Sequence, residues 1–318
     1  MPSSITGLIQ DKQSRLETVP QRLAEQVSRA QMSIFADVLA LLEQLERDEN
    51  GIILPSQKNI DLLNTIRPQL QRILIQSEYA QAVKSFSDEF DKQADLNAEL
   101  YSQSVDYVES QITTNLINTA KRSAMESLIG GALDSAFYNP VIDIINNSIS
   151  TGSGFVETVK ALRLAIVGGE ANGTITDGKL SRYVKQIASD AFAIADRTYN
   201  NQVSQELQLE FYAYVGGIID DTRDFCKVRN GKYFHEKEVE SWINGGGDHA
   251  GNPEPNVEWQ GQYRGTNDGT IFNLCGGYNC KHTLMPVSIT GVPIDVIQRN
   301  LSSGNIKLTE KQKQILGV

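Results

Sequence analysis

The chain is poor in the residues that build disulfide frameworks and metal sites, with three cysteines and three histidines among 318 residues. An odd number of cysteines leaves at least one unpaired, and so few in a long chain are typical of a reducing compartment. Residues 1–17 lack the basic stretch and apolar core of a signal peptide. No apolar run reaches the roughly 18 residues of a membrane span. We therefore expect a protein that is made in a cytosol and has no contact with a membrane.

Positive charge is also scarce, because 29 lysines and arginines face 39 acidic residues and give a formal net charge of −10. Such a surface repels the phosphate backbone, which argues against a sequence-specific nucleic-acid partner. The motifs HExxH, GxxxxGK[ST], GxSxG and SxxK do not occur in the sequence. We therefore assign no catalytic residue and no bound organic cofactor, and an enzyme is the weaker hypothesis.

Residues 18–200 have the apolar periodicity of long helices. Apolar positions recur at spacings of three and four, as in Leu23, Val27, Ala30, Ile34, Val38, Leu41 and Leu45. Pro20 suits a first helical turn, so this helix is expected to begin near Thr18. Stripes of this kind indicate a helical core rather than a cofactor site. The fold class predicted for this part is a mainly α region of long helices, with residues 1–150 as an elongated helical region.

After about residue 211 the pattern changes to short segments separated by glycine, asparagine and proline. "FYAYVGGIID", "KYF", "VEWQGQYRG", "TIFNL" and "TLMPVSI" suit short strands, whereas "GTITDGK" (173–179) and "NGGGDHAGNPEPN" (244–256) suit loops. The C-terminal part of the chain is therefore predicted to form a small α+β, loop-rich module. Residues 291–318 are predicted to add a C-terminal helix and tail.

The strip "LCGGYNCKHTLMPV" (274–287) concentrates the soft metal ligands of the chain. Cys280 and His282 are two residues apart, so on a strand both side chains share one face. Cys275 can fold back across the turn-like "GGYN", and Cys226 can approach from another segment. Three cysteines and one histidine suit a tetrahedral structural zinc. Two alternatives stay open, namely buried cysteines that act as small apolar residues and a redox disulfide between Cys275 and Cys280.

The two remaining histidines are weaker candidates for a metal site. His235 precedes "EKE" and is expected to be exposed or to start a helix. His249 lies in the glycine-rich loop and is expected to be solvated.

Three segments in this order resemble a known family. They are "RYVKQIASDAFAIADRTYNN" (182–201), "DDTRDFCKVRNGKYF" (220–234) and "CGGYNCKHTLMPV" (275–287). Together they are similar to the C-terminal module of phage Mu F-like minor head proteins, also called phage head morphogenesis proteins. The matching positions are Asp220 or Asp221, Arg223, Cys226, Gly231, Phe234, Cys280, Lys281, His282 and Pro286. Asp224 stands where members often have a further cysteine, and Lys281 replaces an arginine. The resemblance covers roughly residues 152–287 and implies a Mu F-like head morphogenesis module at residues 151–290.

The resemblance implies a virion protein, a minor structural component of a tailed-phage head. Such a protein would associate with the portal or the inner capsid, would act in head assembly and possibly in genome ejection, and would form a homo-oligomer or bind to a ring. The alternative is a metal-dependent hydrolase or a toxin-like effector delivered with the virion. That function would need an open metal position and a carboxylate base, for which Asp221, Asp224 and Glu236 are the candidates.

Overall fold

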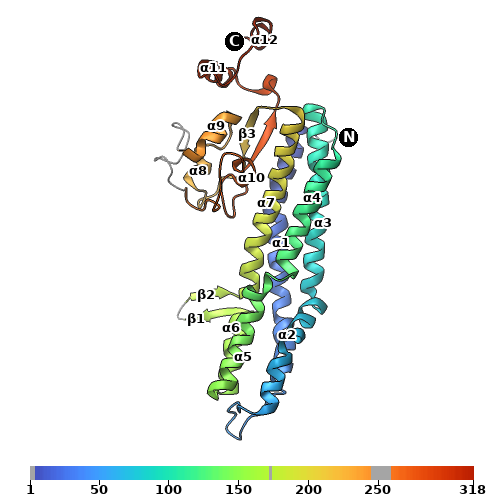
Figure 1. The fold of residues 1–318 in the computed structure, drawn as a ribbon, viewed down its shortest axis with the longest axis vertical. Helices are drawn as coiled ribbons and strands as arrows, with labels where there is room; N and C mark the ends of the chain where they lie inside the picture. The colour runs from blue at the N-terminus through green and yellow to red at the C-terminus, as the bar shows by residue number, and fades with distance from the viewer. Residues whose placement is uncertain (1–3, 172–173, 245–258) are drawn as a thin grey trace. The chain divides into compact units, whose positions relative to one another are not determined.

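The computed structural model describes residues 4–171, 174–244 and 259–318. The chain is mainly α-helical, with long N-terminal helices and a few antiparallel strands in a small C-terminal region, as the sequence predicts (Figure 1). Among the described residues, no helix combines the length and the apolar character needed to cross a membrane.

The long helices at the N-terminal end are α1 (Ile5–Leu42), α2 (Gln57–Gln76), α3 (Glu78–Val105) and α4 (Gln111–Ile129). Helix α1 begins thirteen residues before the predicted start near Thr18, and Pro20 lies inside it. The prediction was wrong because a proline favours a first turn without requiring one. The apolar stripe continues upstream of Pro20 through the buried residues Leu8 and Leu16, and this burial keeps the earlier residues helical.

The chain forms two compact units, each made of separate segments. One unit, here called the ligand unit, comprises Met1–Thr18, Phe90–Lys121 and Ser189–Val318. The other, here called the helical unit, comprises Val19–Glu89 and Arg122–Ala188. Helices α1, α3, α4 and α7 (Lys179–Leu207) contribute residues to both units.

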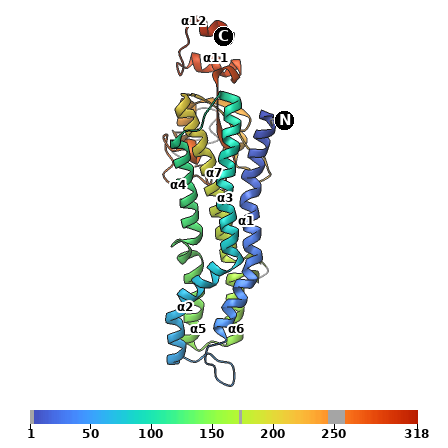
Figure 2. The ribbon, with the colours of Figure 1, turned by 90° about the vertical axis from the view of Figure 1, so that its right-hand side faces the viewer.

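The helical unit adds to these helices a five-residue π-helix, η1 (Asp134–Tyr138), and the helices α5 (Asn139–Thr151) and α6 (Phe155–Ile166). Figure 2 shows α2, α5 and α6 lying side by side, and α5 contacts both α2 and α6. A two-stranded antiparallel hairpin follows, formed by β1 (Gly168–Ala171) and β2 (Thr174–Asp177). The predicted loop 173–179 is thus largely a strand, because Thr174, Ile175 and Thr176 pair with the strand before them.

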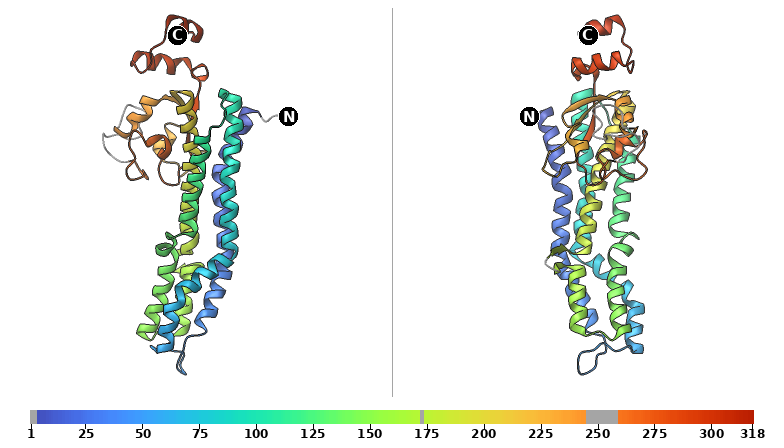
Figure 3. Two further views of the ribbon diagram at one scale, coloured as in Figure 1. Left: turned by 45° about the vertical axis from the view of Figure 1, so that its right-hand side comes forward. Right: turned by 90° about the vertical axis from the view of Figure 1, so that its left-hand side faces the viewer.

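The ligand unit contains a three-stranded antiparallel sheet of order β4-β3-β5. Its strands are β3 (Phe211–Val215), β4 (Lys232–His235) and β5 (Thr283–Val287), and in this register Tyr214 lies opposite Leu284. Figures 1 and 3 show the sheet and its loops beside the C-terminal half of α7. The strands predicted in "FYAYVGGIID", "KYF" and "TLMPVSI" are confirmed.

Short helices fill the rest of the ligand unit. They are α8 (Asp224–Lys227), α9 (Glu236–Ser241), η2 (Trp242–Asn244), α10 (Ile271–Leu274), η3 (Ile289–Gly291), α11 (Ile294–Ser302) and α12 (Glu310–Leu316). The strand predicted in "TIFNL" was wrong, since Ile271–Leu274 is the helix α10. Five residues are too few for period-two and helical patterns to differ. The predicted loop 244–256, with His249, lies outside the described residues apart from Asn244.

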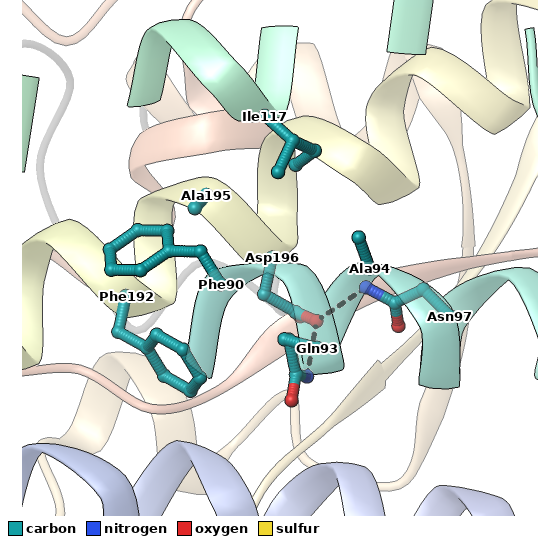
Figure 4. A pocket seen from close by; sticks show the side chains of 8 residues that line it. All are labelled: Phe90, Gln93, Ala94, Asn97, Ile117, Phe192, Ala195 and Asp196. Carbon is teal, nitrogen blue, oxygen red and sulfur yellow. Dashed lines mark hydrogen bonds between the residues drawn. The ribbon is translucent and has the colours of Figure 1, made fainter. Parts of the chain in front are cut away.

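A buried polar network joins the helices of the ligand unit. The Lys12 ammonium lies 2.6 Å from Asn97 Oδ1, 2.7 Å from Asn200 Oδ1 and 3.0 Å from Asp196 Oδ1, so each of its three hydrogens has an acceptor. Asp196 Oδ1 also accepts hydrogen bonds from Gln93 and Asn97. Figure 4 shows these two bonds at the edge of a cavity of about 10 Å³, close to the size of a single water molecule. The network fixes α1, α3 and α7 against one another beneath the sheet.

Candidate metal centre

Three of the four residues predicted to bind zinc lie together in the ligand unit. Cys226 Sγ is 3.5 Å from Cys280 Sγ, and Cys280 Sγ is 3.7 Å from His282 Nδ1. One ligand atom from each residue lies within 4.8 Å of the other two. All three side chains are buried. We call these three residues the Cys/His cluster.

Two neighbouring segments bring the cluster together. Cys226 lies on α8, which follows the central strand β3, and Cys280 and His282 immediately precede β5. Because β5 pairs with β3, the two segments meet although Cys226 and Cys280 are 54 residues apart. Arg223 adds a second link, since its guanidinium donates to the main-chain oxygens of Gly276 (2.8 Å) and Tyr278 (2.6 Å).

The spacing of the cluster fits a tetrahedral metal ion. With zinc–sulfur bonds of about 2.3 Å, two sulfurs of a tetrahedron lie about 3.8 Å apart. With a zinc–nitrogen bond of about 2.0–2.1 Å, a sulfur and a nitrogen lie about 3.6 Å apart. The corresponding separations here are 3.5 and 3.7 Å. Two thiols and one imidazole are also the donors that zinc prefers, so the residues present fit this metal.

Each sulfur of the cluster accepts a hydrogen bond from a fixed donor. The His282 main-chain N–H lies 3.4 Å from Cys280 Sγ, and the Tyr214 hydroxyl lies 3.3 Å from Cys226 Sγ. The hydrogen bond between the two sulfurs raises the pKa of Cys226 and lowers the pKa of Cys280 well below its usual value. The hydrogen bond between the two sulfurs requires a thiol proton, and a metal ion bound by both sulfurs would displace that proton.

Cys275 does not belong to the cluster. Its side chain is completely buried, and its sulfur lies 4.0 Å from the His282 main-chain oxygen. Burial raises the pKa of the Cys275 thiol to about 11, so the thiol keeps its proton at neutral pH. This environment suits a cysteine that acts as a small apolar residue, which is one of the two alternatives to a zinc ligand. All three cysteines are free thiols, and Cys275 and Cys280 form no disulfide.

Helix α7 holds the ligand-bearing strip through polar side chains that the site prediction missed. Arg197 is buried, and its guanidinium donates to the main-chain oxygens of Cys280 (2.6 Å) and His282 (2.9 Å). Asp190 accepts the Asn279 N–H at 2.6 Å, and Asn200 donates to the Thr283 hydroxyl at 2.6 Å. Asp190, Arg197 and Asn200 are spaced by seven and three residues, so they share one helix face. Polar residues at core spacing were the signal in the sequence.

Glu210, His235 and Glu236 form a second group with metal-ligand spacing. His235 is buried and begins α9, as one of its two predicted alternatives states, while the alternative of an exposed side chain was wrong. Its Nδ1 accepts the Lys237 N–H at 3.2 Å, which places the proton of the neutral ring on Nε2. A metal bound at Nε2 would move the ring proton to Nδ1. Nδ1 could then no longer accept the Lys237 N–H that caps the helix. The geometry therefore favours a helix cap over a metal site.

The carboxylates considered for a hydrolytic mechanism are not part of the Cys/His cluster. Asp221 and Asp224 are exposed, and Glu236 belongs to the second group. A general base must reach the water that it activates. The cluster thus offers three ligands in a buried setting without a carboxylate among them.

No protein-family model, curated protein or solved structure matches this chain.

Proposed function

We propose that this chain is a minor structural protein of a tailed-phage head that associates with the portal or the inner capsid during assembly. One observation carries the proposal. The two segments with the most specific resemblance to the Mu F-like module, residues 220–234 and 275–287, meet at the Cys/His cluster. This contact supports the resemblance, because it joins the two segments into one module as the resemblance implies.

The chemistry of the cluster favours a structural role. Cys226 and Cys280 belong to an apolar core that also contains Phe225, Trp242 and Trp259. Three ligands leave the fourth position of a tetrahedral metal open, but a catalytic metal also needs solvent access and a base. The cluster has neither a carboxylate nor an exposed ligand. A hydrolase or effector function is therefore the less supported alternative.

We further propose that Cys226, Cys280 and His282 bind one structural zinc ion. Cys275 was predicted as a fourth ligand, and its position outside the cluster leaves three protein ligands among the described residues. The metal would tie α8 to the strip before β5. Such a tie stabilises a region whose elements are mostly four to six residues long.

Mass spectrometry of purified procapsids and mature particles tests the virion assignment, with the major capsid protein and the portal as internal standards. We expect peptides of this chain in at least one of the two, at a copy number far below that of the major capsid protein. Absence from both would overturn the assignment. The zinc proposal would not be affected, because it rests on the cluster alone.

A further inference from the structure

Tyr214 lies at the edge of the Cys/His cluster with its hydroxyl directed at a ligand atom. The residue is completely buried on the central strand β3. Its hydroxyl is 3.3 Å from Cys226 Sγ, and its ring stacks on the His282 ring at 5.4 Å between centroids, with 14° between the planes. One side chain therefore contacts two of the three proposed ligands, from two different segments.

The partner of this hydroxyl is unusual. A buried tyrosine normally directs its O–H to an oxygen acceptor, as Tyr212 does toward Ser204 and Tyr101 toward Asn200. A neutral thiol is a weak acceptor, whereas a sulfur that carries negative charge is a strong one. A hydroxyl fixed in the apolar core against sulfur is thus matched to a charged, metal-bound thiolate.

The surrounding backbone leaves Tyr214 and His282 little freedom. A Cβ atom at Gly216, two residues after Tyr214, would lie 2.5 Å from His282 Cγ. Phe225 and Trp242 pack edge-on against the Tyr214 ring. The ring therefore keeps its orientation, and the hydroxyl is held on one side of Cys226 Sγ.

We propose that Tyr214 is a positioning residue of the metal centre, which donates a hydrogen bond to the metal-bound sulfur of Cys226 and fixes the His282 ring by stacking. This inference rests on the proposed zinc site. Hydrogen bonds to a ligand tune the ligand's electron donation and orient it, and their removal typically weakens metal binding about 10- to 100-fold. The hydroxyl withdraws electron density from the sulfur, so its loss should make the sulfur a stronger donor in charge transfer.

The test uses the full-length chain with Co²⁺ as a spectroscopic probe and with Zn²⁺ in competition against a chelator. Tyr214→Phe removes one oxygen and keeps the stacked ring. Tyr212→Phe is the matched control, because Tyr212 is a buried tyrosine of the same strand whose hydroxyl partner is Ser204. We expect Y214F to weaken zinc binding about 10-fold or more and to move the sulfur-to-cobalt charge-transfer band to lower energy. Y212F should retain the wild-type band.

Each other outcome counts against the proposal. An unchanged band in Y214F would show that no hydroxyl donates to a metal-bound sulfur. A phenolate-to-metal band in the wild-type chain, lost in Y214F, would make Tyr214 a ligand and would also overturn the proposed role. A wild-type chain that binds neither metal would overturn the zinc proposal together with this inference. Equal shifts in Y214F and Y212F would indicate a general packing effect and would likewise reject it.

Discussion

Gly276 is the residue whose lack of a side chain matters most to the Cys/His cluster. It has a φ of +76°, and a Cβ atom there would lie 2.1 Å from Cys280 Sγ and 3.2 Å from Cys226 Sγ. Gly231 has the same φ of +76° in the same unit, but a Cβ atom there would meet nothing within 4 Å. Alanine substitutions at Gly276 and Gly231 therefore separate the free-energy cost of the left-handed backbone from the cost of crowding the metal ligands.

We predict that Gly276→Ala abolishes metal binding, whereas Gly231→Ala leaves it intact. Both variants should lose about 1–2 kcal/mol of unfolding free energy from the left-handed backbone. Gly276→Ala should lose more, because the sulfurs must move away from the new methyl group. Urea denaturation and zinc stoichiometry measure the two effects. Full zinc occupancy in G276A would show that the ligands are not where the cluster places them.

At the scale of elements, the Lys12–Asp196 pair links the first helix to α7. Both side chains are completely buried, 3.0 Å apart. Removing one partner of such a pair leaves an uncompensated charge in the core, which typically costs about 3–5 kcal/mol. Replacing both partners costs less, because no charge then stays behind.

We predict that Lys12→Met destabilises the chain by about 3–5 kcal/mol and that adding Asp196→Asn recovers a large part of the loss. Urea denaturation of Lys12→Met, Asp196→Asn, the double variant and the wild type checks this. If the double variant is as unstable as the sum of both single variants, the two charges do not act as a pair.

At the scale of the whole molecule, the division into two units predicts which segments are destabilised when the metal is absent. All three cluster residues belong to the ligand unit, and α2, α5 and α6 belong to the helical unit. Removal of the proposed zinc ion should therefore loosen the segments that the cluster joins and leave the helices of the other unit protected.

We predict that a chelator, or Cys280→Ser, accelerates amide exchange in residues 211–235 and 271–287 and not in α2, α5 and α6. Hydrogen exchange followed by mass spectrometry resolves these segments. Cys275→Ala is the control, since Cys275 lies outside the cluster, and it should retain one zinc ion. Loss of zinc in C275A would restore Cys275 as a ligand, and equal loosening in both units would contradict a local role for the metal.

The sequence by itself determined the fold class, because apolar residues at spacings of three and four can be buried along one face only as helices. It also limited the candidate ligands to Cys226, Cys275, Cys280 and His282, since soft ligands are rare in this chain and one strip holds two cysteines beside a histidine. It identified the strands β3, β4 and β5 from a local pattern, namely short runs of residues bounded by glycine and proline.

Only the tertiary structure decided the rest. Cys275 and Cys280 look equivalent in the sequence, but only Cys280 lies within metal-ligand reach of both Cys226 and His282. Tyr214 and Arg197 join the site because β3 pairs with β5 and α7 lies against the strip, and neither contact has a local signature. The start of α1 and the limits of the two units depend in the same way on burial between distant segments. Local patterns specify elements, and long-range contacts specify which of their side chains meet.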